Sequence, residues 1–167
     1  MEKKHIVHDL KVNYNGPLSI EGFYAEVDKW LDERGLEKEI KRKSEDVNPK
    51  DKKIEWVIEA WKEVTQHVKR VVRLRVLFDN VKEIRVKRRG HTIRVNQADV
   101  LVDIDGFLET KLQYQWTQHP IYTFLRVLYD KYVWMIIEKH EGPVNQDCYD
   151  LHRRLTSFFN LSKMKVE

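Results

Sequence analysis

Residues 98–116 read ADVLVDIDGFLETKLQYQW, and this stretch decides the fold. Its even positions are mostly apolar from Ala98 to Trp116, whereas its odd positions hold most of the polar side chains. Successive side chains of a β-strand point to opposite faces, so this alternation predicts a half-buried strand. Gly106 has no side chain to pack, which predicts a bulge or a bend in the middle of that strand.

Shorter alternating runs precede this stretch and predict further strands of the same sheet. They are His5–Tyr14, with Ile6, His8, Leu10, Val12 and Tyr14 on one face, and then Ile54–Val64 and Val68–Phe78. The highly charged run Leu36–Ser44 predicts an edge strand, because charge on an edge deters unwanted pairing. Asn15-Gly16-Pro17 predicts a turn, and residues 46–53 predict a loop.

Three polar breaks divide the region between Phe78 and Ala98. Asp79-Asn80 predicts the end of a strand that Ile84 and Val86 resume, and Asn96-Gln97 predicts a kink or a turn. Arg89-Gly90 predicts a two-residue hairpin turn, because Gly90 can supply a positive φ.

Helical spacing of apolar residues appears in three places. Ser19 is a good N-cap for a first helix, and Gly35 predicts its end. Pro120 suits the first turn of a second helix, whose stripe over Ile121–Ile137 is broad enough to predict cover on more than one side. Gly142-Pro143 predicts its end. A shorter final helix around Cys148 is then expected to pack on the sheet, the long helix or a second subunit.

These elements predict a single α+β domain over residues 1–167. We expect a curved antiparallel sheet of about six or seven strands, packed against a long C-terminal helix, in the order β-α-β(n)-α-α. This layout resembles the helix-grip architecture of START-like (SRPBCC) proteins. Residues 13–17 and 105–110 are also similar to segments of small uncharacterised archaeal proteins. The chain departs from the helix-grip pattern in having one N-terminal helix where two are common, and in the additional final helix.

Composition narrows the function classes. Of the 167 residues, 41% are hydrophobic and 35% are charged, so the chain is globular rather than disordered. The net charge of +4 permits a nucleic-acid or acidic partner without requiring one. Cys148 is the single cysteine, so no intramolecular disulfide can form, and a reducing, cytoplasmic compartment is expected. Residues 121–137 contain three charged residues, which argues against a membrane span.

No motif for catalysis or for a cofactor is present. The chain has no phosphate-binding glycine loop, no nucleophile elbow and no histidine or cysteine spacing typical of a metal site. Asp99, Asp103 and Asp105 share one strand face and could hold a hard cation, but an ion-pair lattice with arginines of the neighbouring strands is the favoured interpretation. We expect a non-enzymatic binding domain with neither metal nor cofactor.

The first functional hypothesis is a pocket for an apolar or amphipathic small molecule between sheet and helix. The helix-grip resemblance implies such a pocket, and the aromatic residues supply a lining, although they can equally fill a core. Arg70 shares the apolar parity of its strand and would be either a polar anchor or a group at the strand end. The candidate pocket residues are Trp56, Arg70, Tyr114, Trp116, Tyr122 and Tyr129.

The second hypothesis is an RNA- or ribosome-contacting protein. Basic residues cluster around the hairpin turn at Gly90 and could lie against phosphates, although a solvated, charge-protected hairpin is the simpler interpretation. The residues are Arg85, Lys87, Arg88, Arg89, His91 and Arg94, with Lys41–Lys43 and Lys50–Lys53 as a possible extension. The third hypothesis is an oligomeric scaffold module that associates through the apolar helix 121–137.

Overall fold

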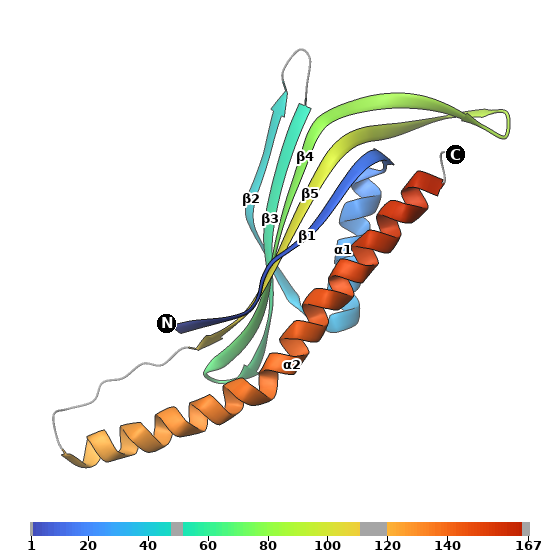
Figure 1. The fold of residues 1–167 in the computed structure, drawn as a ribbon. Coiled ribbons are helices and arrows are strands. Elements are labelled where there is room, and N and C mark those ends of the chain that lie inside the picture. The colour runs from blue at the N-terminus through green and yellow to red at the C-terminus, as the bar shows by residue number, and fades with distance from the viewer. Residues whose placement is uncertain (1, 48–51, 111–119, 165–167) are drawn as a thin grey trace.

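The computed structural model describes residues 2–47, 52–110 and 120–164. Its elements are β1 (Glu2–Leu18), α1 (Ile20–Arg34), β2 (Glu37–Val47), β3 (Lys52–Thr65), β4 (Val68–Arg88), β5 (His91–Thr110) and α2 (Pro120–Met164). The strands form one antiparallel sheet in the order β1-β5-β4-β3-β2, with both helices on the same side of it (Figure 1). The predicted α+β class is confirmed, and the charged segment that we expected at an edge forms the edge strand β2.

The sheet has five strands, so the expected count of six or seven is wrong. Asp79-Asn80 does not end a strand: a bulge lies between Asp79 and Lys82 inside β4, where Asn80 takes a φ of 53°. Residues 96 and 97 likewise lie within β5, and residues 15–17, where we expected a turn, pair with residues 97–99 as part of β1. A bulge absorbs an extra residue by bending the strand, so turn-forming residues need not end it.

β1 departs from strict alternation. Two irregularities in its pairing with β5 fall between His5 and Val7 and between Val7 and Leu10. As a result Val7 is buried, whereas His8, which we placed on the apolar face, is exposed. Asp9 takes a φ of 52° at the second irregularity, a conformation that Asp tolerates better than most residues.

α1 begins and ends where its sequence predicts. The Ser19 side chain accepts a hydrogen bond from the Gly22 amide at 3.0 Å, and Gly35 ends the helix in the left-handed conformation. Its buried face packs on the covered side of the sheet, where the Phe23 ring lies 5.4 Å from that of Phe78 and 6.4 Å from that of Trp56. Aromatic burial of this kind supplies much of the core.

The second half of α2 packs across β1 and β5. Val144, Cys148, Leu151 and Leu155 are fully buried there. Gly106 is buried beneath them, and a β-carbon on it would lie only 2.4 Å from Cys148 Sγ and 2.8 Å from a Val144 methyl carbon. The glycine that predicted a bulge or a bend therefore lets the helix approach the sheet closely.

α2 is one helix, which corrects the predicted stop at Gly142-Pro143. Pro143 lies inside it, and the helix changes direction along its length (Figure 1). A proline within a helix removes one hydrogen bond and favours a bend. Burial of the adjacent Val144 against the sheet offsets that loss, so the chain bends instead of ending the helix.

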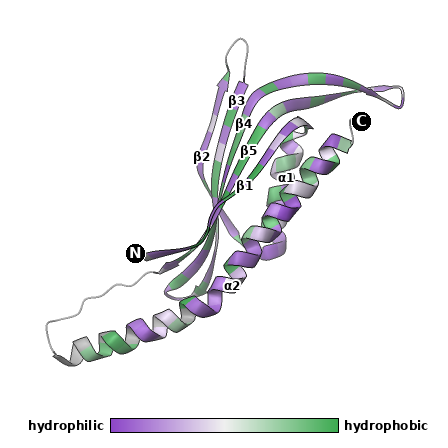
Figure 2. Cartoon of the chain, in the orientation of Figure 1, coloured by the Kyte–Doolittle hydropathy of each residue, from purple (hydrophilic) through white to green (hydrophobic). Residues whose placement is uncertain are grey.

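The first half of α2 extends beyond the sheet (Figure 1). Figure 2 shows hydrophobic stretches along this outlying part. Its exposed large apolar residues are Phe124, Leu125, Val127, Leu128, Tyr132, Trp134 and Met135. The expectation that this stripe is covered on more than one side is therefore wrong for these seven residues.

Candidate nucleic-acid interface

The β4–β5 hairpin projects from the sheet as a two-stranded arm, which we define as residues 82–97 (Figure 1). The pairing of β3 with β4 ends at Ile54 and Phe78, and that of β1 with β5 ends at Leu18 and Asn96. Within the described chain, the two strands beyond that point pair only with each other. A two-stranded ribbon that stands alone is marginally stable.

The tip of the arm is the two-residue turn that the sequence predicts. Arg88 pairs with His91, and the two residues between them, Arg89 and Gly90, have φ values of 50° and 80°. Positive φ at both central positions is the geometry that matches the twist of the flanking strands. The turn exposes the Arg89 side chain.

The net positive charge of the protein comes from this arm. Residues 82–94 hold six lysines and arginines against one glutamate, a net charge of +5 with His91 neutral. Because the whole chain carries +4, the rest of the chain has a net charge of −1. The basic pI therefore comes from one projecting element.

The two faces of the arm differ. Ile84, Val86, Ile93 and Val95 pair across one face, and all but Ile93 are partly buried. The opposite face carries exposed polar side chains, and its strand pairs are Glu83 with Asn96, Arg85 with Arg94, and Lys87 with Thr92. Arg94 and Glu83 form one long, exposed ion pair of 3.6 Å. Two arginines thus lie directly opposite each other with a single nearby acid.

Three cations of the other basic runs that we considered are held in ion pairs. Lys41 lies 3.0 Å from Glu39, Arg42 lies 3.6 Å from Glu55, and Lys52 lies 2.6 Å from Glu45. Lys50 is outside the described residues. Ion pairs within β2 and β3 therefore match these cations.

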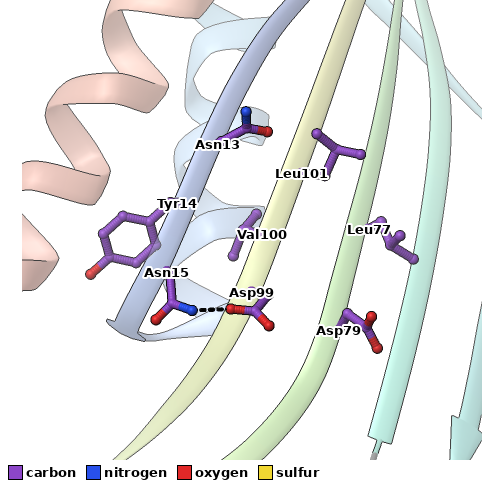
Figure 3. Close-up of a pocket in the computed structure, with 8 residues that line it drawn as sticks. All are labelled: Asn13, Tyr14, Asn15, Leu77, Asp79, Asp99, Val100 and Leu101. Carbon is purple, nitrogen blue, oxygen red and sulfur yellow. Dashed lines mark hydrogen bonds between the residues drawn. The ribbon is translucent and has the colours of Figure 1, made fainter.

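A polar network lies at the base of the arm. Asp79 and Asp99 lie opposite each other in β4 and β5, and Asn80 donates to Asp99 at 3.0 Å while Asn15 donates to its other oxygen. Asn15, Asp79 and Asp99, with Tyr14 and Leu101, line an open surface hollow of about 460 Å³ (Figure 3). The network connects the bulge at Asn80 to β1 and β5.

The pocket candidates lie in different environments. Trp56 is 4% exposed and packs edge-to-face on Tyr24 at 4.7 Å, so it is part of the filled core. Tyr114 and Trp116 lie outside the described residues. Tyr122 and Tyr129 belong to α2, but their side chains are outside the described part. The structure therefore brings no set of these residues together around a cavity within the described chain, and the pocket stays a prediction.

Arg70 proves to be a structural anchor. Its Nε lies 3.4 Å from Asp147, a carboxylate that is 2% exposed, and Arg34 reaches the same carboxylate at 3.1 Å and Asp150 at 2.9 Å. Burial raises the pKa of Asp147 despite both arginines. Burial works against ionisation of Asp150 too, but the Arg34 hydrogen bond and charge hold its pKa below the ordinary value.

The strand-face carboxylates have different partners from those expected. Asp105 and Asp103 lie opposite Arg73 and Arg75, yet Arg73 donates to Glu59 at 2.6 and 3.0 Å. Asp105 instead accepts from the Asp9 amide at 2.9 Å and lies 3.4 Å from His8. Arg73 and Glu59 form an ion pair on this face, but in the described structure none of the three aspartates pairs with the arginines that we expected, so the predicted lattice is not confirmed for them.

One group of side chains has the composition of a cation site. Ligand atoms of His8, Asp9 and Asp105 lie within 4.8 Å of one another, and carboxylate and imidazole donors suit divalent metals. The same atoms already interact with each other and with a backbone amide. Sequence alternation missed this group, because only the irregularity at Asp9 brings residue 8 to Asp105.

Cys148 is a small, fully buried side chain on the face of α2 that packs on the sheet. Burial, with the nearby Asp147 and Asp105 carboxylates, raises the pKa of its thiol to about 12. A thiol of this kind stays protonated at neutral pH and is a poor nucleophile.

No family model, curated protein or solved structure matches this chain. The fold and the surface chemistry therefore carry the functional argument alone. Among the described helices, none has both the length and the hydropathy needed to cross a membrane.

Proposed function

We propose that this protein binds the phosphate backbone of a structured nucleic acid, RNA in the first instance, through the basic arm. The observation that carries the proposal is the pairing of Arg85 with Arg94 on the exposed face of a free-standing ribbon. Like charges directly opposite on a strand pair destabilise it, and a two-stranded ribbon has little stability to lose. The phosphates of a polyanionic partner would attract both arginines and offset the repulsion between them.

The shape of the arm supports the same function. A two-stranded ribbon is one of the elements that enters a nucleic-acid groove or follows its backbone. The seven residues from Lys82 to Arg88 extend about 23 Å at the usual rise of a strand, which is enough to cross a groove. Apart from His91 the arm has no aromatic residue, so stacking on single-stranded bases is not expected.

The helix-grip resemblance supports a different function, a small-molecule pocket between sheet and helix. The five-stranded sheet and the long helix agree with that layout at a coarse level. Packing of Trp56 within the aromatic core favours the arm over the pocket as the first function to test.

The test measures binding to a duplex RNA and a duplex DNA of the same sequence over a series of salt concentrations. Each phosphate contact contributes a slope of roughly −0.9 in log K against log salt for B-form DNA. Reversing charge with Arg85→Glu plus Arg94→Glu should lower the affinity at least tenfold and reduce the slope by about 2. Comparison of the two duplexes identifies which nucleic acid is preferred.

The matched control is Lys29→Glu plus Lys139→Glu, which makes the same change in net charge at exposed positions on α1 and α2. We expect it to keep most of the wild-type affinity. Equal losses in both double variants would mean that binding follows net charge and not the arm. The absence of salt-dependent binding to either duplex would contradict the proposal.

A single substitution separates binding from folding. Arg85→Glu places opposite charges across the arm, which should stabilise the ribbon by about 0.2–1 kcal/mol. The same change removes a phosphate contact and adds a repulsion, so affinity should fall. A folded, equally or more stable variant that binds more weakly would exclude unfolding as the cause.

A further inference from the structure

The first half of α2 exposes an unusually large apolar surface. Seven large side chains between residues 124 and 135 are 45% to 65% exposed. At about 200 Å² for each side chain, half exposed, they present roughly 700 Å² to solvent. This is more than the largest apolar patch of a typical monomer and close to the roughly 800 Å² that each partner buries in a standard protein interface.

The order of these residues along the helix is symmetric. Around the midpoint between residues 129 and 130, Phe124 mirrors Met135, Leu125 mirrors Trp134, and Val127 mirrors Tyr132. At 100° per residue the seven side chains cover about half of the helix circumference, and Phe124 and Met135 lie near its centre. Six of the seven apolar residues are therefore mirrored by another apolar residue, whereas Leu128 is mirrored by Lys131.

We propose that this half of α2 packs antiparallel against the same half of α2 in a second copy of the chain. A two-fold axis at the midpoint places Phe124 of one copy level with Met135 of the other, and the remaining mirrored pairs level with each other. An isologous contact requires this self-complementarity, since each residue meets its mirror position. A partner with an unrelated surface would not require it.

The charged residues fit the same arrangement. Lys131 is level with Leu128 of the second copy, where its methylene groups can cover the leucine while its ammonium group stays in water. Trp134 is already partly covered within its own chain, because its Nε1 donates to Glu138 at 2.7 Å and Lys4 lies 4.7 Å from the ring. The two copies of Lys131 lie about 4.5 Å apart along the helix direction, so their ammonium groups have to turn outward into water.

This contact is independent of the proposed nucleic-acid function. The arm and the first half of α2 lie at opposite ends of the molecule (Figure 1). Pairing through α2 therefore leaves both arms exposed, and either proposal can fail without the other.

The first experiment measures mass by sedimentation velocity from about 1 to 100 µM. We expect the wild-type chain to be a dimer, and Phe124→Glu plus Met135→Glu to be monomeric, because the two-fold contact brings the new carboxylates together. The control Leu161→Glu plus Met164→Glu changes exposed apolar residues at the far end of the same helix and should stay dimeric. A monomeric wild-type chain, or a dimer that survives the first double variant, would overturn the proposal.

The second experiment tests the antiparallel direction by oxidative cross-linking. Neither Phe124→Cys nor Met135→Cys should cross-link alone, whereas a mixture of the two should form a heterodimer through a disulfide. The native Cys148 is buried and its thiol pKa is about 12, so it stays silent. Cross-linking of either single variant by itself would contradict the antiparallel arrangement.

The third experiment asks whether lipid covers the face instead. If a monomeric wild-type chain binds phosphatidylcholine vesicles and Phe124→Glu plus Met135→Glu abolishes that binding, the face serves a membrane surface, and the proposal fails. If the chain is a dimer and does not bind the vesicles, the result supports the contact between copies.

Discussion

Gly106 marks a contact between sheet and helix that leaves no room for a side chain. Gly106→Ala would place its methyl group against Cys148 and Val144, and overpacking of this kind costs about 1–3 kcal/mol. We expect thermal unfolding to show that loss. Cys148→Ala in the same chain removes the sulfur atom and should recover part of the stability lost, so the two changes are not additive.

Gly142→Ala is the matched control for this prediction. A β-carbon on Gly142 meets no atom within 4 Å, and alanine is favoured over glycine within a helix by about 0.5–1 kcal/mol. Unfolding midpoints that fall equally for both glycine substitutions would show that the close approach at Gly106 is not the cause.

Asp103 gives the clearest pH-dependent prediction. Burial, followed by the neighbouring Asp105 and Asp9 carboxylates, raises its pKa above the ordinary value, and its Oδ1 is buried without a hydrogen bond. A raised pKa means that the folded state binds the proton more tightly. The resulting stability is fully present below the unfolded pKa and is lost as pH rises through the folded pKa.

Asp103→Asn removes that pH dependence because the amide stays neutral. The variant should therefore melt at a higher temperature than the wild type at pH 7, and the difference should shrink as pH falls below 4. Melting curves at several pH values measure this directly. A lower melting temperature for the variant at pH 7 would contradict the assignment.

At the scale of elements, Asp147 connects α2 to α1 through Arg34 and to β4 through Arg70. Removing the Asp147 carboxylate leaves Arg70 without its acid, whereas Arg34 keeps Asp150, and an unpaired buried charge costs about 3–5 kcal/mol. Asp147→Ala should therefore destabilise the fold by that amount in urea unfolding.

An exposed ion pair of α2 is the control for Asp147. Arg153 is 77% exposed and lies 3.5 Å from Asp150, so Arg153→Ala should cost less than about 1 kcal/mol. A cost for Asp147→Ala no larger than this would mean that the cluster does not position the helix.

Most elements are predictable from the sequence, and the exceptions share a physical cause. The alternation of apolar and polar residues correctly predicted β3 and the covered face of β5. The capping residues correctly predicted both ends of α1. Asp79-Asn80 and Gly142-Pro143 were interpreted as ends because turn formers and proline usually interrupt an element. In this fold the first pair lies at a bulge and the second at a bend in the helix. Whether an element continues or ends at such residues depends on the packing of its neighbours.

At the scale of the whole molecule, the charge on the arm and its turn were predictable, whereas its projection was not. The sequence contains the basic residues and Gly90, but the length of the free ribbon depends on where β1 and β3 stop pairing. Exposure of the first half of α2 was missed for the same reason. An apolar stripe predicts that a helix is covered, and it does not say whether its own chain supplies the cover.

The free-standing ribbon also has a consequence for the energy landscape of the protein. Its backbone hydrogen bonds have no third strand to protect them in the described structure, so they open without unfolding the five-stranded body. Amide hydrogens beyond Ile84 should therefore exchange with solvent far faster than those of the core strands, and trypsin should cut first at the arginines near Gly90. Hydrogen exchange and trypsin cleavage at the arm can therefore report binding, because a ligand bound to the arm will slow both and leave exchange in the core unchanged.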